Sequence, residues 1–108
     1  MIYEMRIYHC APGRIRALNA RFTNITLGYF EKYGIRQVGF WTTLVGSSNQ
    51  TLTYMLAWES LAERETKWNA FAQDQQWIAE REATEAEAVI VERIENVFLS
   101  PTAYSAMK

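Results

Sequence analysis

The feature that most constrains this chain is the order in which its apolar residues change period. Residues 2–9 alternate between two faces, as in a β-strand, and residues 14–34 then repeat apolar side chains every three or four positions, as in a helix. Two more strand-like stretches follow at 35–46 and 51–59, separated by the turn-forming sequence GSSNQ. The pattern predicts a strand, a helix and a β-hairpin, in that order.

The next part of the chain predicts a divided helical element. Ser60 followed by Glu63 is a capping box, in which the Ser60 hydroxyl can accept from the amide of Glu63 and the Glu63 carboxylate from the amide of Ser60. A helix is therefore expected to begin at Leu61. The polar sequence QDQQ around residue 74 indicates a break. After it, a second short helix is expected from about Trp77 to Glu87.

Residues 88–100 alternate again and complete the order β-α-β-β-α-β. This order predicts an α+β domain of the ferredoxin-like type, with both helical elements on one face of a single sheet. A chain of 108 residues is long enough for one hydrophobic core and shorter than chains that usually divide. We therefore expect a single domain over residues 1–108.

The other face of such a sheet has no helix to cover it. Alternation places Phe40, Leu44, Met55 and Ala57 on that face, which is a larger apolar patch than soluble monomers usually expose. A second copy packed sheet to sheet would cover the patch by an isologous contact. We expect a homodimer, with higher assembly left open.

Charge and composition exclude several classes of partner. The net charge is −1, from 11 basic and 12 acidic residues, so no nucleic acid partner is expected. No run of about 18 apolar residues predicts a membrane span. The lone cysteine, Cys10, has no intrachain partner, and no Cys/His cluster could hold a metal, so neither a metal nor a cofactor is expected. With no signal-like stretch after Met1, these features favour a cytoplasmic protein.

His9 is the only histidine and a candidate for acid–base chemistry, because its ordinary pKa lies near neutrality. Alternation groups His9 with the more apolar residues of the first strand, and this group is expected to face the helices. The alternative is a strand-end histidine satisfied by backbone or solvent. Arg6, on the other side of the strand, is expected near the dimer interface.

Four tryptophans in so short a chain indicate a cavity with flat, weakly polar walls. Trp58 and Trp68 are expected on facing surfaces of sheet and helix. Trp41 follows on the neighbouring strand, and Trp77 begins the second short helix. Tyr54 shares the strand face of Trp58 and is a second candidate for proton transfer. The alternative is that these side chains simply fill the core.

Arg64 lies beside the capping box and could pair with an acidic group of a ligand. The alternative is an arginine on the helix surface, where ion pairs contribute little. The chain contains no glycine-rich phosphate loop, no GxSxG elbow and no HExxH helix. The sequence therefore names no reaction by motif.

The stretches GFWTTLVG and YMLAWESLAER, followed by Trp68 and Trp77, resemble the NIPSNAP family, as does the opening MIYEMRIYHCAPG. The resemblance runs from Met1 to about Tyr104. It implies a dimeric α+β barrel, in which two ferredoxin-like subunits press their sheets together with the helices outside. The wider superfamily includes cofactor-free monooxygenases, muconolactone isomerases and heme-degrading enzymes, many of which hold a ligand between helices and sheet.

The leading hypothesis is a NIPSNAP-like homodimer of unassigned activity that binds a small apolar or aromatic molecule between helices and sheet. Its expected ligand-binding residues are Trp41, Trp58, Trp68, Trp77 and Arg64. One alternative is a cofactor-independent monooxygenase or isomerase, in which His9 or Tyr54 moves a proton. Another is a non-catalytic scaffold dimer. A drug-sized cavity would favour binding, whereas side chains packed at interior density would favour the scaffold.

Overall fold

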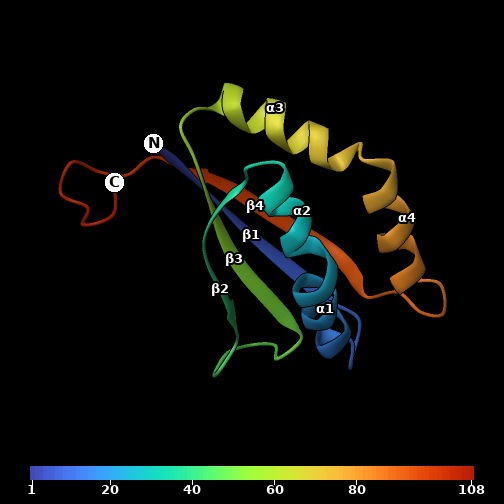
Figure 1. The fold of residues 1–108 in the computed structure, drawn as a ribbon. Helices are drawn as coiled ribbons and strands as arrows, with labels where there is room; N and C mark the ends of the chain where they lie inside the picture. The colour runs from blue at the N-terminus through green and yellow to red at the C-terminus, as the bar shows by residue number, and fades with distance from the viewer.

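The computed structural model describes residues 1–108 as one antiparallel sheet with helices over one face (Figure 1). The strands lie in the order β2-β3-β1-β4, which is the α+β ferredoxin-like arrangement that the sequence predicts. The elements in chain order are β1 (Ile2–Cys10), α1 (Ile15–Arg21), the π-helix η1 (Phe22–Thr26), α2 (Leu27–Lys32), β2 (Arg36–Thr42), β3 (Thr51–Trp58), α3 (Leu61–Ala72), α4 (Gln75–Thr84) and β4 (Val91–Leu99).

The first helical element is continuous from α1 through η1 to α2. Gly13 and Gly34 flank it with φ angles of 78° and 67°, a left-handed conformation that glycine adopts without steric cost. Within η1 the amide of Leu27 donates to the carbonyl of Phe22, five residues back. The helix predicted over 14–34 is confirmed, and its wide π turn is an addition that periodicity did not predict.

Capping side chains begin both later helices. The hydroxyl of Ser60 accepts from the amide of Glu63 at 3.1 Å, so α3 begins where the capping box predicts. The carboxylate of Glu63 accepts from the amide of Glu59 at 3.0 Å, one residue before the amide that was expected. Asp74 accepts from the amide of Trp77 at 2.9 Å, and α4 therefore begins at Gln75 rather than at Trp77.

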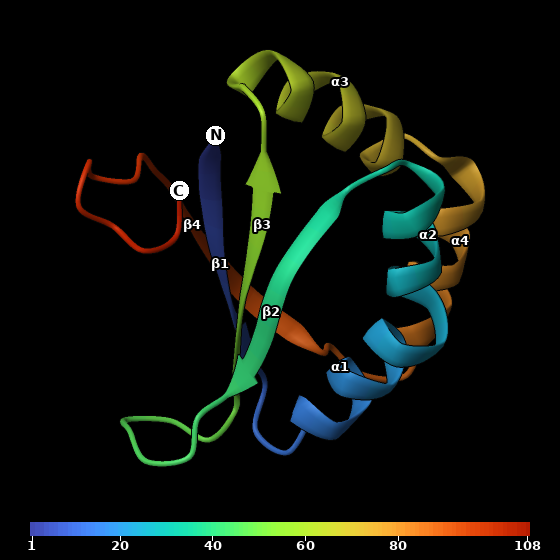
Figure 2. The same cartoon turned by 60° about the vertical axis from the view of Figure 1, so that its left-hand side comes forward.

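The main core lies between the sheet and the helices, which all cover one face (Figure 2). From β3, Tyr54, Leu56 and Trp58 are fully buried, and Leu18 and Phe30 meet them from the helices. The prediction that this face of β3 points inward is confirmed. None of the helices has the length and apolar character that crossing a membrane requires.

The two faces of β1 are the reverse of the prediction. Glu4, Arg6 and Tyr8 lie opposite the inward-facing residues of β3 in the antiparallel register, and directly opposed residues share a face. These three side chains are therefore buried beneath the helices. The expectation that Arg6 lies near a dimer interface is wrong, because Arg6 and Glu4 form an ion pair at 2.9 Å and so enter the interior together.

The open face of the sheet carries its own apolar cluster. Tyr3, Met5, Met55 and Ala57 pack together there, apart from the main core. His9 lies on the same face, because it is opposite Thr51 in the register and two residues from Ile7 along the strand. The expectation that His9 faces the helices is therefore wrong.

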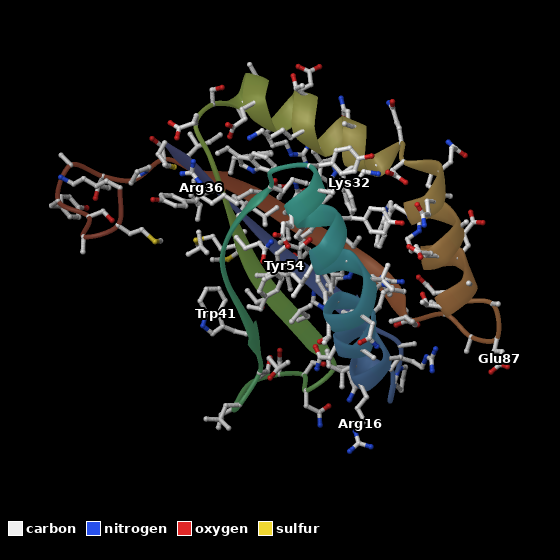
Figure 3. The ribbon with its side chains drawn as sticks, viewed as in Figure 1. Arg16, Lys32, Arg36, Trp41, Tyr54 and Glu87 are labelled. Atoms are coloured by element: carbon white, nitrogen blue, oxygen red, sulfur yellow. The ribbon has the colours of Figure 1, made fainter.

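On β2 the alternation is shifted by an irregular register between Gln37 and Gly39. Phe40 packs inward and stacks on Tyr54, with ring centroids 5.0 Å apart, although it was expected on the open face. Trp41 points outward on the open face and is 52% exposed (Figure 3). Leu44 lies in the hairpin loop and is 98% exposed, so it belongs to neither face.

Candidate functional site

A cavity of about 470 Å³ lies between the sheet and the helices. Arg6 and Tyr8 of β1 contribute to its lining, together with Val91 and Ile94 of β4. The helices contribute, among others, Phe22, Thr26, Phe30, Trp68, Phe71 and Trp77. The volume falls within the range of roughly 300–1,000 Å³ that small-molecule sites occupy.

Aromatic rings from three helices form the wall opposite the sheet. Phe71 is central, with its ring centroid 4.8 Å from Trp77, 5.1 Å from Trp68 and 5.2 Å from Phe30. These tilted and edge-on contacts are the geometries that aromatic pairs prefer. They fix the rings against one another, and the cavity therefore has flat apolar walls of defined position.

Glu4 is a fully buried carboxylate behind the cavity that accepts five hydrogen bonds. Arg64 donates two of them, at 3.1 and 3.0 Å, and Arg6 donates one at 2.9 Å. The indole of Trp58 donates at 3.1 Å and the amide of Asn96 at 3.0 Å. Burial by itself raises the pKa of Glu4, but the bonds from Arg64, Asn96 and Arg6 outweigh it, so the net shift is downward and the carboxylate stays ionised at neutral pH.

Arg6 connects this carboxylate to two tyrosines. Its Nε donates to the Tyr54 hydroxyl at 2.9 Å and its Nη2 to the Tyr8 hydroxyl at 3.4 Å. The guanidinium carbon lies 4.3 Å from the ring centroid of Trp68, a cation–π contact. Burial by itself lowers the pKa of Arg6, but the tyrosines and Glu4 reverse that effect and raise it. The side chain is a permanent cation in the cavity wall.

Tyr54 is fully buried and lies between the sheet and the helices (Figure 3). Its hydroxyl is 2.8 Å from that of Tyr8. Burial first, and then the neighbouring Tyr8, raise the pKa of Tyr54 well above its ordinary value. The phenol is therefore protonated throughout the physiological range.

The other end of the cavity is built around Arg21, which is 5% exposed. Its Nη1 donates to Glu85 at 2.8 Å and to Thr84 at 3.3 Å. Its Nε has no hydrogen-bond partner in the protein, and neither has the hydroxyl oxygen of Thr26, a residue that is 3% exposed. Buried polar atoms without partners are rare in folded proteins, so these two are candidate ligand contacts.

The cavity brings together some of the predicted residues. Trp68 and Trp77 line it, as expected. Trp58 and Tyr54 lie behind the lining, where they bond to Glu4 and Arg6 respectively. Arg64 also stays outside the lining, with its guanidinium 5.0 Å from the Trp68 ring centroid, and pairs with an acidic group of the protein itself.

Two predicted residues do not reach the cavity. His9 lies on the open face, where its Nε2 meets the Glu95 carboxylate at 2.5 Å. Trp41 lies on the same face, pointing away from the helices (Figure 3). His9 therefore has no geometric support as an acid or base within this cavity.

Sequence reasoning missed the polar half of the site. Glu4, Arg6 and Tyr8 recur at every second position, so two opposite charges and a phenol share one strand face. That spacing was the available signal, because oppositely charged neighbours on one face can be buried as a pair. Arg21 and Thr26 carried no comparable signal, since their burial depends on how the π turn packs against the sheet.

The fold and this cavity define an α+β ferredoxin-like protein with a helix-covered aromatic pocket. The family model for NIPSNAP matches residues 3–106, so the chain belongs to the NIPSNAP family. No curated protein matches the chain significantly.

Solved structures share this fold. An uncharacterised NIPSNAP domain protein from Burkholderia xenovorans is 28% identical, with a TM-score of 0.83 over 97% of this chain and 98% of that one. A NIPSNAP family protein from Agrobacterium tumefaciens is 23% identical, with a TM-score of 0.87 over 99% and 98%. A candidate antibiotic biosynthesis monooxygenase from Deinococcus radiodurans shares the fold at 12% identity, with a TM-score of 0.64 over 100% and 99%.

Proposed function

We propose that this NIPSNAP protein binds a small, flat aromatic molecule in the cavity between its helices and its sheet. The observation that carries the proposal is the cavity of about 470 Å³, walled by Trp68, Phe71 and Trp77. A scaffold with a filled interior would have side chains in that space at interior density. Rigid aromatic walls with a few fixed polar groups are the usual design of small-molecule sites.

The proposal includes a second copy of the chain on the open face of the sheet. The apolar cluster around Met55 is extended by partly exposed side chains on both edge strands, among them Trp41 and Val97 at 52% and 46% exposure. A single copy would leave these side chains in water, and a sheet-to-sheet contact would bury them symmetrically. The second copy would stiffen the sheet that forms the floor of each cavity.

Intrinsic tryptophan fluorescence tests the binding proposal, because two tryptophans line the cavity. Naphthalene, 1,4-naphthoquinone and 2-naphthoate are titrated into the purified protein. Binding is expected to change the emission and to raise the thermal midpoint, since a ligand at about 100 times its Kd stabilises the folded state by roughly 2.7 kcal/mol. The fluorescence response should be reduced in Trp68→Phe.

The matched control is Trp41→Phe, which removes a tryptophan from the open face and should leave the ligand-dependent change in emission intact. If none of the three compounds changes either the emission or the thermal midpoint of the native protein, the cavity is not an aromatic-binding site. Equal loss of response in the Trp41 and Trp68 variants would place binding elsewhere.

A further inference from the structure

The hydroxyl of Tyr54 has only one place to donate its proton. Its two partners are the Nε of Arg6, at 2.9 Å, and the hydroxyl of Tyr8, at 2.8 Å. A guanidinium donates and cannot accept, so the Tyr54 proton goes to Tyr8 or remains unpaired in a fully buried position. Because a buried donor without a partner costs free energy, Tyr8 is the acceptor of the Tyr54 proton. The chain of donation therefore runs from Arg6 to Tyr54 to Tyr8.

This direction leaves the proton of Tyr8 without an acceptor in the protein. Tyr8 already accepts from Tyr54, and its remaining contact, with Nη2 of Arg6 at 3.4 Å, is also to a donor. Because Tyr8 lines the cavity, its hydroxyl can donate to a molecule held there. Arg6 and Tyr54 thus orient a donor at the sheet side of the cavity.

Two more polar atoms without partners belong to residues that line the cavity from the helices. Arg21 and Thr26 both line it, both are more than nine-tenths buried, and the Nε of the one and the hydroxyl of the other have no partner. Phe22 lies between them in sequence and packs on Tyr8, with ring centroids 5.9 Å apart. Tyr8, Arg21, Phe22 and Thr26 therefore all belong to the lining of the same cavity.

The cavity is also cationic within a slightly acidic protein. The chain as a whole carries a net charge of −1. The charged residues lining the cavity have an excess of arginine, and adding the buried pair behind it, Glu4 and Arg64, leaves that excess unchanged. The lining contains Arg6, Arg21 and Arg81 against Glu85 and Glu92, and Arg93 adds nothing to the excess because it pairs with Glu95 at 3.4 Å on the open face. A bound anion would balance this excess of positive charge.

We propose that the ligand is an aromatic oxyanion, a flat ring bearing a carboxylate or phenolate oxygen. Its oxygens accept from Tyr8 and from the unsatisfied donors of Arg21 and Thr26, while the ring lies against Trp68 and Phe71. This inference rests on the proposed aromatic-binding function and adds the charge and the hydrogen-bonding pattern of the molecule that binds. Charge-assisted hydrogen bonds are roughly twice as strong as neutral ones.

Three probes of similar shape separate charge from ring. Isothermal titration calorimetry with 2-naphthoate, 2-naphthamide and naphthalene measures their affinities for the purified protein at neutral pH. The naphthoate is expected to bind at least about tenfold tighter than the amide, because the charged acceptor meets two or more donors. Equal affinities for all three would leave aromatic binding intact and refute the oxyanion.

Two variants test the donors themselves. Thr26→Val keeps the shape of the side chain and removes a hydroxyl that bonds to nothing in the protein, so the variant should fold with unchanged or greater stability and yet lose several-fold in naphthoate affinity. Tyr8→Phe should also weaken naphthoate more than naphthalene. The matched control is His9→Gln on the open face, which should bind naphthoate like the native protein.

The affinities of these variants for naphthoate and naphthalene, read together with their stability, decide whether the assignment holds. Loss of naphthoate affinity in folded Thr26→Val and Tyr8→Phe, with naphthalene affinity retained, supports the assignment. A Thr26 variant that loses stability but binds naphthoate normally would mean that the hydroxyl is structural, and it would overturn the assignment. Failure of every probe to bind the native protein would refute the oxyanion and the aromatic-binding function together.

Discussion

At the scale of single residues, Glu4 is the centre of the polar network behind the cavity. Its carboxylate compensates two guanidinium groups, those of Arg6 and Arg64, at 2.9 and 3.0 Å, and its side chain is not exposed. Burying a carboxylate costs free energy, and only its interactions with the partners offset that cost. The network therefore holds Arg6 in place, and through Arg6 the hydroxyls of Tyr54 and Tyr8.

Glu4→Gln is expected to destabilise the protein strongly, because the charge that compensates two arginines disappears. Loss of one partner of a buried ion pair typically costs about 3–5 kcal/mol in unfolding free energy. Urea denaturation measures it. The matched control is Glu59→Gln, since Glu59 pairs with Arg36 at 3.3 Å with both side chains more than half exposed, and such pairs contribute at most about 1 kcal/mol. Equal losses in both variants would contradict the structural role of Glu4.

The prediction from the sequence was wrong about which face of β1 points inward. Alternation correctly divided β1 into two faces, but the choice of the inward face followed hydrophobicity alone, which places Glu4 and Arg6 outside. Glu4 and Arg6 are partners only two residues apart, but most of their other partners lie 48 to 92 residues away along the chain, for example Tyr54 for Arg6 and Asn96 for Glu4. The local spacing could indicate the Glu4–Arg6 pair, but it could not identify these distant partners.

At the scale of elements, periodicity and capping chemistry predicted the secondary structure well. The capping box placed the start of α3 at Leu61, and the alternation of 51–59 gave the inward face of β3. The start of α4 was placed two residues late because Asp74 was not recognised as its N-cap. The π turn η1 was not predicted, and its extra residue moves the inward positions after it to Thr26 and Phe30, which are buried.

Asp74 joins the end of α2 to the start of α4. Its carboxylate accepts from the amide of Trp77 at 2.9 Å, from Lys32 at 3.1 Å and from the hydroxyl of Tyr33. The hydrogen bond from Tyr33, followed by that from the Trp77 amide, lowers the pKa of Asp74 from 3.8 to about 2. Because the folded-state pKa is depressed, the stabilisation is complete above pH 4 and is lost as pH falls toward 2.

Asp74→Asn should therefore change stability in a pH-dependent way. Asparagine can still cap the helix, but it carries no charge for the hydrogen bonds from Tyr33 and Lys32. Thermal midpoints of the native protein and the variant, measured from pH 6 to pH 2, are expected to differ most at pH 6 and to converge below pH 4. A difference that stays constant across that range would show that the charge of Asp74 makes no contribution.

At the scale of the whole molecule, the topology and the family followed from the sequence, whereas the cavity did not. The order of strands and helices allows one economical packing, and that packing is the one observed. The empty volume depends on how side chains from β1, β4 and the helices fail to fill the space between them. Trp68 and Trp77 were predictable as its walls, but Trp58 could not be told apart from them without knowing the depth at which it packs.

In the proposed dimer the two faces of the sheet have different partners, with helices and cavity on one side and a second copy on the other. Sedimentation equilibrium at micromolar concentration tests this directly. The native protein is expected at twice its chain mass of 12.6 kDa. Val97→Glu, on the open face and 46% exposed, should shift the mass toward that of one chain.

Leu61→Glu is the matched control, because Leu61 is 60% exposed at the start of α3 on the helical side, and the variant should remain a dimer. A native protein that sediments as a single 12.6 kDa chain over the whole concentration range would contradict the account, since the open face would then be stable in water.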